Sequence, residues 1–426
     1  MKLYPLSLVL ISVAVAVGYL LLGSSLTVYL TLSIFYLIGA RIVTAQVPSR
    51  KVSIFIVLAA LVFRFIAFTQ PPTFSNDVFR YRFEGQVQAQ GLNPYLLRPS
   101  DPESSRFRDA AWGQVVAKDF RAGYGPLIER IEAWNWRLAK GATDDPFRQA
   151  HLFKIPAALF DLGCLVLLWI LAPGRILLYA WCPVVVVEFW GNGHNDAVPV
   201  FFILAALLAA KRNWQWLVFL LLGFGIAAKW WPAILLLAFS GREIRRVMYW
   251  PLAALPVLVF GFPYWANVTE NAQFMTGFVG GWRNNDSLFG LIAKLFANPY
   301  HAKYAVFGLI SAAAVAIAAL RNRTLEWRVL ATLTTLLLLS ANCHVWYLTW
   351  LAALLPLSTS YGVQAWVSLV PIFHLSRMEE ILTGQWHGVL EERWYVYLPV
   401  FLLFGVDLLP AVFRCFSTHR RQKQIP

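Results

Sequence analysis

The first segment of this sequence that could do chemistry begins at Ser75 and reads Ser-Asn-Asp-Val-Phe-Arg-Tyr-Arg-Phe-Glu. Ser and Asn both cap helices. A helix that starts here would carry an acid, a cation, a phenol and a second acid on one face: Asp77, Arg80, Tyr81 and Glu84. The simpler alternative is that Asp77 favours the helix dipole and that Arg80–Glu84 is a surface ion pair. From spacing alone, this alternative is the more common case.

A second polar segment runs from Glu188 to Asp196 and reads Glu-Phe-Trp-Gly-Asn-Gly-His-Asn-Asp. Glu188 lies at the end of an apolar run, where an ionisable side chain is costly and indicates function. His194, Asn195 and Asp196 follow in a glycine-containing turn. The alternative is a plain turn in which Asn195 or Asp196 caps the next helix.

Three further segments place polar residues beside apolar ones. Lys229 precedes Trp-Trp-Pro, where it could snorkel to the membrane interface or give a point charge to a phosphate. Arg283 and Asp286 lie in a glycine-containing loop. His344 and Trp346 lie at the start of an apolar run, where tryptophans more often form an interfacial belt than a site.

The elements that must position these residues are membrane helices. The chain is 59% hydrophobic and only 14% charged, with a mean hydropathy of +0.58, which excludes a soluble 426-residue protein. We expect an all-α polytopic transmembrane bundle with about 12–14 membrane segments. Apolar runs occur at 6–22, 26–43, 52–69, 152–171, 176–190, 197–210, 214–228, 232–240, 247–262, 304–320, 326–340, 345–357, 361–374 and 394–413.

The net charge of +14 has a topological explanation. Cytoplasmic loops collect Lys and Arg, and an inside N-terminus gives alternate inside segments that hold seventeen cations and two acids. The basic balance therefore does not indicate nucleic-acid binding. The long segments 70–150, 263–303 and 375–393 then lie outside, and all five polar segments fall on that side. Within the first of them, 124–138 predicts an amphipathic helix on the membrane or on a neighbouring unit, with an apolar face of Leu127, Ile131, Trp134 and Leu138.

Several common sites are missing from the sequence. We find no G-x-x-x-x-G-K-[ST] loop, no G-x-G-x-x-G fingerprint and no D-x-D pair, so a soluble nucleotide donor has no obvious site. The four cysteines form no CxxC pair. No compact set of oxygen ligands is visible, so we predict neither a metal nor another cofactor.

Taken together, the polar segments resemble those of a known family. Residues 75–95 are similar to the first-loop signature of integral membrane glycosyltransferases of the GT-C superfamily, and closest to polyprenyl-phosphate-mannose-dependent mannosyltransferases. Short segments at 193–196, 229–232, 285–287 and 344–350 resemble further family segments in the same order. His344-Val-Trp departs from the expected His-Pro-Trp, which puts the local turn in doubt more than the histidine.

The resemblance implies a single integral membrane domain over residues 1–426 and an inverting transfer from a polyprenyl-phosphate sugar, with Asp77 as general base. Mannose is the sugar it favours. The implied donor-binding residues are Arg80, Tyr81, Lys229, Arg283 and His344. The implied acceptor- or sugar-binding residues are Glu84, Glu188, His194, Asn195, Asp196, Asp286 and Trp346.

The expected partners are the lipid-linked donor, membrane lipids, and a glycan, glycolipid or protein acceptor. The resemblance places the chain in a bacterial cytoplasmic membrane, with its site facing the periplasm or exterior. A transporter or flippase of a lipid-linked sugar or small solute is the alternative. The acceptor and the oligomeric state are open at this point.

Overall fold

The regular structure of the described chain is helical, as the apolar runs predict. The computed structural model describes residues 4–46, 48–267, 282–383 and 387–422. Parts of the predicted outer segments 263–303 and 375–393 therefore lie outside the described residues. Within those limits there is no strand, and only an isolated parallel bridge joins Asn284 to Asn342. The all-α class is confirmed.

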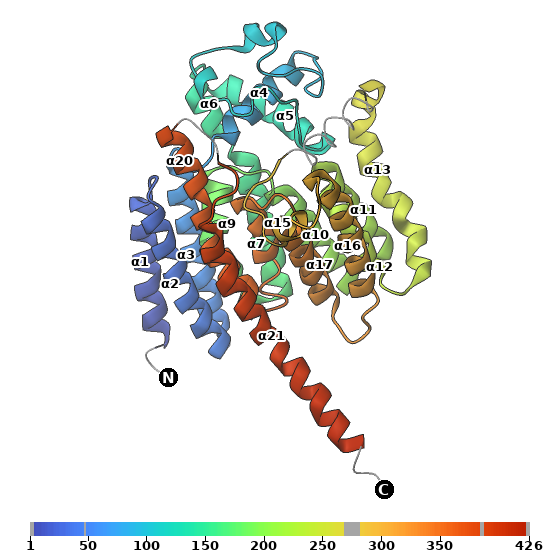
Figure 1. Cartoon of the computed structure of the whole chain (residues 1–426). Helices are drawn as coiled ribbons and strands as arrows, with labels where there is room; N and C mark the ends of the chain where they lie inside the picture. The colour runs from blue at the N-terminus through green and yellow to red at the C-terminus, as the bar shows by residue number, and fades with distance from the viewer. Residues whose placement is uncertain (1–3, 47, 268–281, 384–386, 423–426) are drawn as a thin grey trace.

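Three consecutive helices form the N-terminal part of the bundle: α1 (Tyr4–Leu21), α2 (Leu26–Ala45) and α3 (Arg50–Thr69) (Figure 1). Serine side chains cap two of them, because the Ser25 hydroxyl accepts from the backbone N–H of α2 and Ser49 does the same for α3. The two N-caps fix the residues at which α2 and α3 begin.

A polar lobe, residues 74–152, covers one end of the bundle, while both chain termini lie at the opposite end (Figure 1). The predicted helix at Asp77 and the predicted amphipathic helix both form. The lobe consists of α4 (Asp77–Ala89), η1 (Pro102–Phe107), η2 (Trp112–Gln114), α5 (Pro126–Ala142) and α6 (Pro146–Leu152).

The central part of the bundle contains α7 (Ile155–Leu171), α10 (Ala197–Lys211), α11 (Gln215–Ala228) and α13 (Trp250–Gly261). The apolar run 176–190 is not one helix. It follows η3 (Pro173–Arg175) as α8 (Leu177–Ala180), α9 (Pro183–Val186) and the π-helical turn η4 (Val187–Gly191). Pro183 has no N–H to continue the preceding helix, which explains the break. Glu188 lies within η4, and π-turns are frequent at functional sites.

A buried ion pair holds this broken segment in place. Arg64 of α3 donates to Asp161 of α7 at 2.6 Å, and neither side chain is exposed. Trp190, at the end of η4, donates its indole N–H to the same carboxylate at 2.7 Å. A charge inside a membrane must be compensated by such partners, so the pair fixes the segment that carries Glu188.

The remaining chain completes the bundle and returns twice to the polar lobe. Its elements are η5 (Trp231–Ile234), α12 (Leu235–Ser240), η6 (Ile244–Tyr249), η7 (Phe262–Asn267), α15 (Leu288–Ala293), α16 (Pro299–Ala318), α17 (Leu325–Leu339), η8 (Val345–Tyr347), α18 (Leu348–Ala352), α19 (Tyr361–Leu369), η9 (Val370–His374), α20 (Leu375–Thr383) and α21 (Arg393–Gln422).

Five helical stretches are long and apolar enough to cross a membrane: 26–45, 50–69, 146–171, 245–265 and 300–318. Four shorter apolar helices accompany them among the described residues. Large apolar side chains such as Leu10, Phe65 and Phe307 point outward from these helices. A bundle that exposes such side chains requires lipid around it, which confirms a polytopic membrane protein.

Candidate active site

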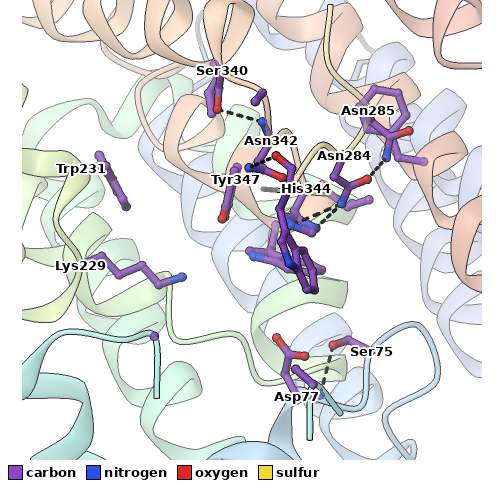
Figure 2. A pocket seen from close by; sticks show the side chains of 18 of the residues that line it. Ser75, Asp77, Lys229, Trp231, Asn284, Asn285, Ser340, Asn342, His344 and Tyr347 are labelled. Carbon is purple, nitrogen blue, oxygen red and sulfur yellow. Dashed lines mark hydrogen bonds between the residues drawn. The ribbon is translucent and has the colours of Figure 1, made fainter. Parts of the chain in front are cut away.

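A cavity of about 770 Å³ opens where the polar lobe meets the bundle. Its walls come from segments that are far apart in the sequence: the start of α4, residues 116–124, residues 229–231, residues 282–289, helices α16 and α17, and residues 340–347. Figure 2 shows Asp77 and Ser75 on one side of this space and His344 on the other, with Lys229 extending toward it. Of the predicted residues, those that line the cavity are Asp77, Arg80, Glu84, Lys229, His344 and Trp346.

Asp77 is the first residue of α4 and remains partly exposed to the cavity. The Ser75 hydroxyl accepts from its backbone N–H at 3.2 Å, while Asn76, the formal N-cap, makes no side-chain cap bond. The Tyr81 and Tyr124 hydroxyls donate to Asp77 Oδ2 at 3.4 and 3.5 Å. The other oxygen, Oδ1, has no hydrogen-bond partner among the described residues. Oδ2 is therefore held by hydrogen bonds, whereas Oδ1 is available to a ligand in the cavity.

His194 lies behind Asp77 and joins it to Glu188. His194 Nδ1 is 3.6 Å from Asp77 Oδ2, and its Nε2 is 3.2 Å from Glu188 Oε2. Gly193 makes this approach possible: its φ is +76°, and a Cβ there would lie 2.9 Å from Val78 of α4. The His194 ring therefore lies between two carboxylates, and its stacking on Trp346 holds its plane.

Glu188 is fully buried and is satisfied by four neighbours. Its Oε1 accepts from Tyr29 at 3.2 Å and lies 3.0 Å from His374 Nε2. Its Oε2 accepts from Asn192 at 3.1 Å, beside the His194 ring. Glu188 therefore links α2, η4 and η9.

Trp346 lies between two histidines. Its ring stacks on His194 with centroids 4.0 Å apart, and on His344 with centroids 4.4 Å apart. Nδ1 of His344 is 2.6 Å from the Asn284 amide nitrogen, which donates to it. Burial, with smaller effects from His194 and Lys229, lowers the pKa of His344 to about 3. The lowered pKa favours a neutral imidazole, and its Nε2 lies 3.3 Å from the same amide nitrogen.

Lys229 is held by Asp196 on the cavity wall. The Lys229 ammonium lies 2.7 Å from Asp196 Oδ2, and the Trp350 indole donates to Asp196 Oδ1 at 2.8 Å. Lys229 also lies over the rings of Tyr124 and Tyr347, at 5.1 and 5.8 Å. Asp196 makes no side-chain cap bond to α10. The lysine is therefore positioned at the cavity rather than directed to the membrane interface.

The Arg80–Glu84 pair is buried, not a surface pair. Arg80 Nε donates to Glu84 Oε1 at 2.6 Å, and its two NH groups donate to the carbonyls of Ala117 and Phe120, both at 2.8 Å. Its guanidinium therefore ties α4 to the 117–120 segment. This leaves Arg80 in the cavity wall with each of its nitrogens already engaged.

Four predicted residues lie behind the wall or beside it. Tyr81 reaches Asp77 as described, and Asn195 donates to Glu132 of α5 at 2.8 Å. Arg283 donates to Asp286 at 2.6 Å, and neither lines the cavity. Asp286 is buried, and its backbone carbonyl accepts from Arg393.

Sequence reasoning missed several cavity residues: Tyr124, Arg121, Asn284, Lys303, His374 and Arg377. His374 and Arg377 have helical spacing with Glu380, but their place beside an apolar run favours an interfacial interpretation. The available signal was weak: Lys303 and Arg377 are cations at the ends of apolar runs, a position that membrane anchors also occupy.

One half of the cavity is apolar. It passes between α16 and α17 and is lined by Phe289, Val306, Ile310, Leu336 and Leu337. Phe307 of α16 also lines it and is largely exposed, so the apolar half reaches the outer surface of the bundle. The cavity thus combines a carboxylate and a lysine with an apolar channel. This combination suits a ligand with a polar head and a hydrocarbon tail.

Comparison with known proteins identifies the family. Residues 5–244, more than half of the chain, match the family model described as Alpha-(1->6)-mannopyranosyltransferase, N-terminal domain. No curated protein and no solved structure matches the chain. The matched region contains the polar lobe, Asp77, the 188–196 turn and Lys229. The chain thus belongs to the alpha-(1->6)-mannopyranosyltransferase family and is a mannose-transferring membrane glycosyltransferase.

Proposed function

We propose that this chain is an inverting GT-C glycosyltransferase that moves mannose from a polyprenyl-phosphate donor to an acceptor hydroxyl, with Asp77 as general base. The observation that carries the proposal is the state of the Asp77 carboxylate. Three neighbours approach Oδ2, while Oδ1 is without a partner at the edge of the cavity. A base must come within hydrogen-bond reach of the proton that it removes, and Oδ1 has that freedom.

The shape of the cavity supports a lipid-linked donor. The cations Lys229, Arg121 and Lys303 line it, and its apolar lining reaches the bundle surface at α16 and α17. A phosphate at the polar end would meet cationic donors, and the first isoprene units would follow the apolar channel. The absence of nucleotide-binding motifs agrees with this donor class.

The reaction follows from this placement. An acceptor oxygen attacks the anomeric carbon as the bond from that carbon to the phosphate oxygen breaks, and Asp77 takes the acceptor proton. The bond electrons leave with the lipid phosphate, whose charge Lys229 and the neutral His344 ring stabilise. Inversion converts a β-linked donor into an α-linked product, which agrees with the α linkage in the family description.

The residues behind the wall have supporting roles in this scheme. His194 holds Oδ2 of Asp77, and Glu188 fixes the orientation of His194. Trp346, stacked on both His194 and His344, holds the two imidazole rings in place. Asn195, Arg283 and Asp286 hold the loops that form the walls, whereas Glu84 orients Arg80.

The charge distribution supports an outer location for the site. Both termini lie at the end of the bundle opposite the polar lobe (Figure 1). The basic loops assign the terminal side to the cytoplasm. The polar lobe and the cavity then face the exterior or periplasm, and the resemblance adds the bacterial cytoplasmic membrane as the host. The acceptor would be a glycan, glycolipid or protein that presents a hydroxyl at this face.

Transfer of label tests the proposal. Purified protein is given radiolabelled polyprenyl-phosphate-mannose and a membrane glycolipid extract. We expect label in a new glycan with the wild type, and a loss of about 10³-fold or more with Asp77→Asn. Asp119→Asn, an exposed carboxylate of the same lobe, is the matched control and should transfer at the wild-type rate.

Two outcomes would contradict the proposal. Transfer at the wild-type rate by Asp77→Asn would remove Asp77 as the base. Movement of the labelled lipid across vesicle bilayers, without any new glycan, would favour the alternative of a flippase.

A further inference from the structure

Three glutamates meet inside the polar lobe, and the proposed transfer uses only one of them, Glu84, through its contact with Arg80. Glu84 comes from α4, and Glu129 and Glu132 come from successive turns of α5. Their exposed fractions are 1%, 0% and 2%. One oxygen from each lies within 4.8 Å of an oxygen from each of the others. Glu84 is distant from the other two in the sequence, so this set of oxygens is not visible before the chain folds.

In each carboxylate, one oxygen accepts a hydrogen bond and the other accepts none from the described residues. The satisfied oxygens accept from Arg80 at 2.6 Å, from Gln88 at 2.8 Å and from Asn195 at 2.8 Å. The second oxygens are buried and have no hydrogen-bond partner among the described residues: Glu84 Oε2, Glu129 Oε1 and Glu132 Oε2. Orphan buried acceptors are uncommon in native proteins, and three at one place indicate a missing positive partner.

The charge count leads to the same conclusion. Arg80 is the only cation that pairs with the three carboxylates among the described residues. Three ionised carboxylates and one guanidinium leave two negative charges in a water-poor interior, which is strongly unfavourable. One divalent cation would neutralise the cluster.

We propose that Glu84, Glu129 and Glu132 bind one divalent, oxygen-preferring metal ion of the Ca²⁺, Mn²⁺ or Mg²⁺ class. The donor set consists only of carboxylate oxygens, which hard cations prefer. Oxygens up to 4.8 Å apart fit around an ion with metal–oxygen distances of about 2.4 Å, as for calcium. Glu84 also lines the cavity, which places the cluster beside it.

The ion would position the site rather than take part in the transfer. It would join α4 to α5, and through the Glu132–Asn195 bond it would join the lobe to the 188–196 turn. Asp77 begins α4, and His194 precedes Asn195 in that turn. The metal would therefore fix the distance between Asp77 and His194 without touching either residue.

Metal content tests this directly and does not depend on transfer. The full chain is purified in detergent, stripped with EDTA, incubated with Ca²⁺, Mn²⁺ or Mg²⁺ and desalted, and its metal is measured by mass spectrometry. We expect about one equivalent of at least one ion in the wild type, and a rise in Tm of several degrees at saturation. Bound Mn²⁺ should also give an altered electron-paramagnetic-resonance signal.

Variants make the result decisive. Glu129→Gln and Glu132→Gln should each remove the bound metal and the ion-dependent rise in Tm. Glu103→Gln, an exposed glutamate of the same lobe, should keep both. If the folded wild type retains no ion and shows no Tm response to any of the three, the proposal is wrong. Metal binding at the wild-type level by both Glu129→Gln and Glu132→Gln would also overturn the proposal. Neither result would test the role of Asp77 as general base.

Discussion

Asp77 Oδ2 lies 3.6 Å from Nδ1 of His194, and this contact joins the polar lobe to the membrane bundle. The opposite nitrogen of the same ring faces the buried Glu188. The proposed base is therefore held from behind by a histidine whose own orientation is set inside the bundle. Any change in the packing of the lobe on the bundle reaches Asp77 through this contact.

His194→Asn should reduce kcat by about 10²-fold with little change in KM, because Asp77 loses the group that orients it while the walls of the cavity remain. Glu188→Gln should have a smaller effect in the same direction. His301→Asn, an exposed histidine of α16, is the control. Steady-state kinetics and the pH profile are measured together. A change in KM alone, with kcat intact, would argue against the orienting role.

Lys229→Met should abolish transfer and also destabilise the protein, because it leaves the buried Asp196 carboxylate without its cation. Removing one partner of a buried pair costs about 3–5 kcal/mol. Lys229→Met combined with Asp196→Asn should recover much of the stability but none of the transfer. The Tm and the transfer rate of the two single variants and the double variant give the comparison. Recovery of transfer in the double variant would exclude Lys229 as the phosphate partner.

Ile310→Trp should block the apolar channel between α16 and α17, since Ile310 lines it. We expect KM for a long polyprenyl donor to rise about tenfold, with little change for a donor that carries a short chain of one or two isoprenes. Leu309→Trp is the matched control, because Leu309 is its exposed neighbour and does not line the cavity. Equal effects on both donors would place the tail elsewhere.

His344 should make stability depend on pH. Its pKa is about 3 in the folded protein, against about 6.5 when exposed. Below pH 6.5 the unfolded chain therefore binds a proton that the folded chain does not. Stability is complete above pH 6.5 and falls by about 1.4 kcal/mol per unit as the pH drops toward 3.

His344→Gln should flatten this fall when the Tm is followed between pH 7.5 and 5. His301→Gln, exposed on α16, should follow the wild type. An unchanged pH dependence in His344→Gln would show that the imidazole is not neutral in the fold.

Gly85→Ala should separate α4 from α5. A Cβ at Gly85 would lie 2.4 Å from the backbone carbonyl oxygen of Glu132, which cannot move aside without shifting the helix. Overpacking of this kind costs about 1–3 kcal/mol, and it should also lower metal binding at the glutamate cluster. Gly141→Ala, where a Cβ meets nothing within 4 Å, should be neutral or slightly stabilising. The Tm and metal content of the two variants are compared.

The helix α5 shows what hydrophobic periodicity predicts and what it does not. The spacing of Leu127, Ile131, Trp134 and Leu138 predicted an amphipathic helix, and the helix is confirmed. Its apolar face is not the buried one throughout, because Trp134 is 57% exposed and Leu138 47% exposed. The polar face instead buries Glu129 and Glu132. In a membrane protein, exposed apolar groups find lipid, whereas polar groups require partners within the protein.

The apolar runs and the Lys and Arg distribution determined the helical class, the membrane environment and an expected sidedness, because these depend on local hydropathy and charge. Local spacing also placed Asp77 at the start of a helix with Arg80 and Glu84 on the same face. Only the tertiary structure decided which polar groups meet. The contacts of Asp77 with His194, of Lys229 with Asp196, and of Glu84 with Glu129 and Glu132 join residues far apart in the chain. Their pairing depends on how the lobe packs on the bundle. The spacing of residues within one segment does not predict that packing.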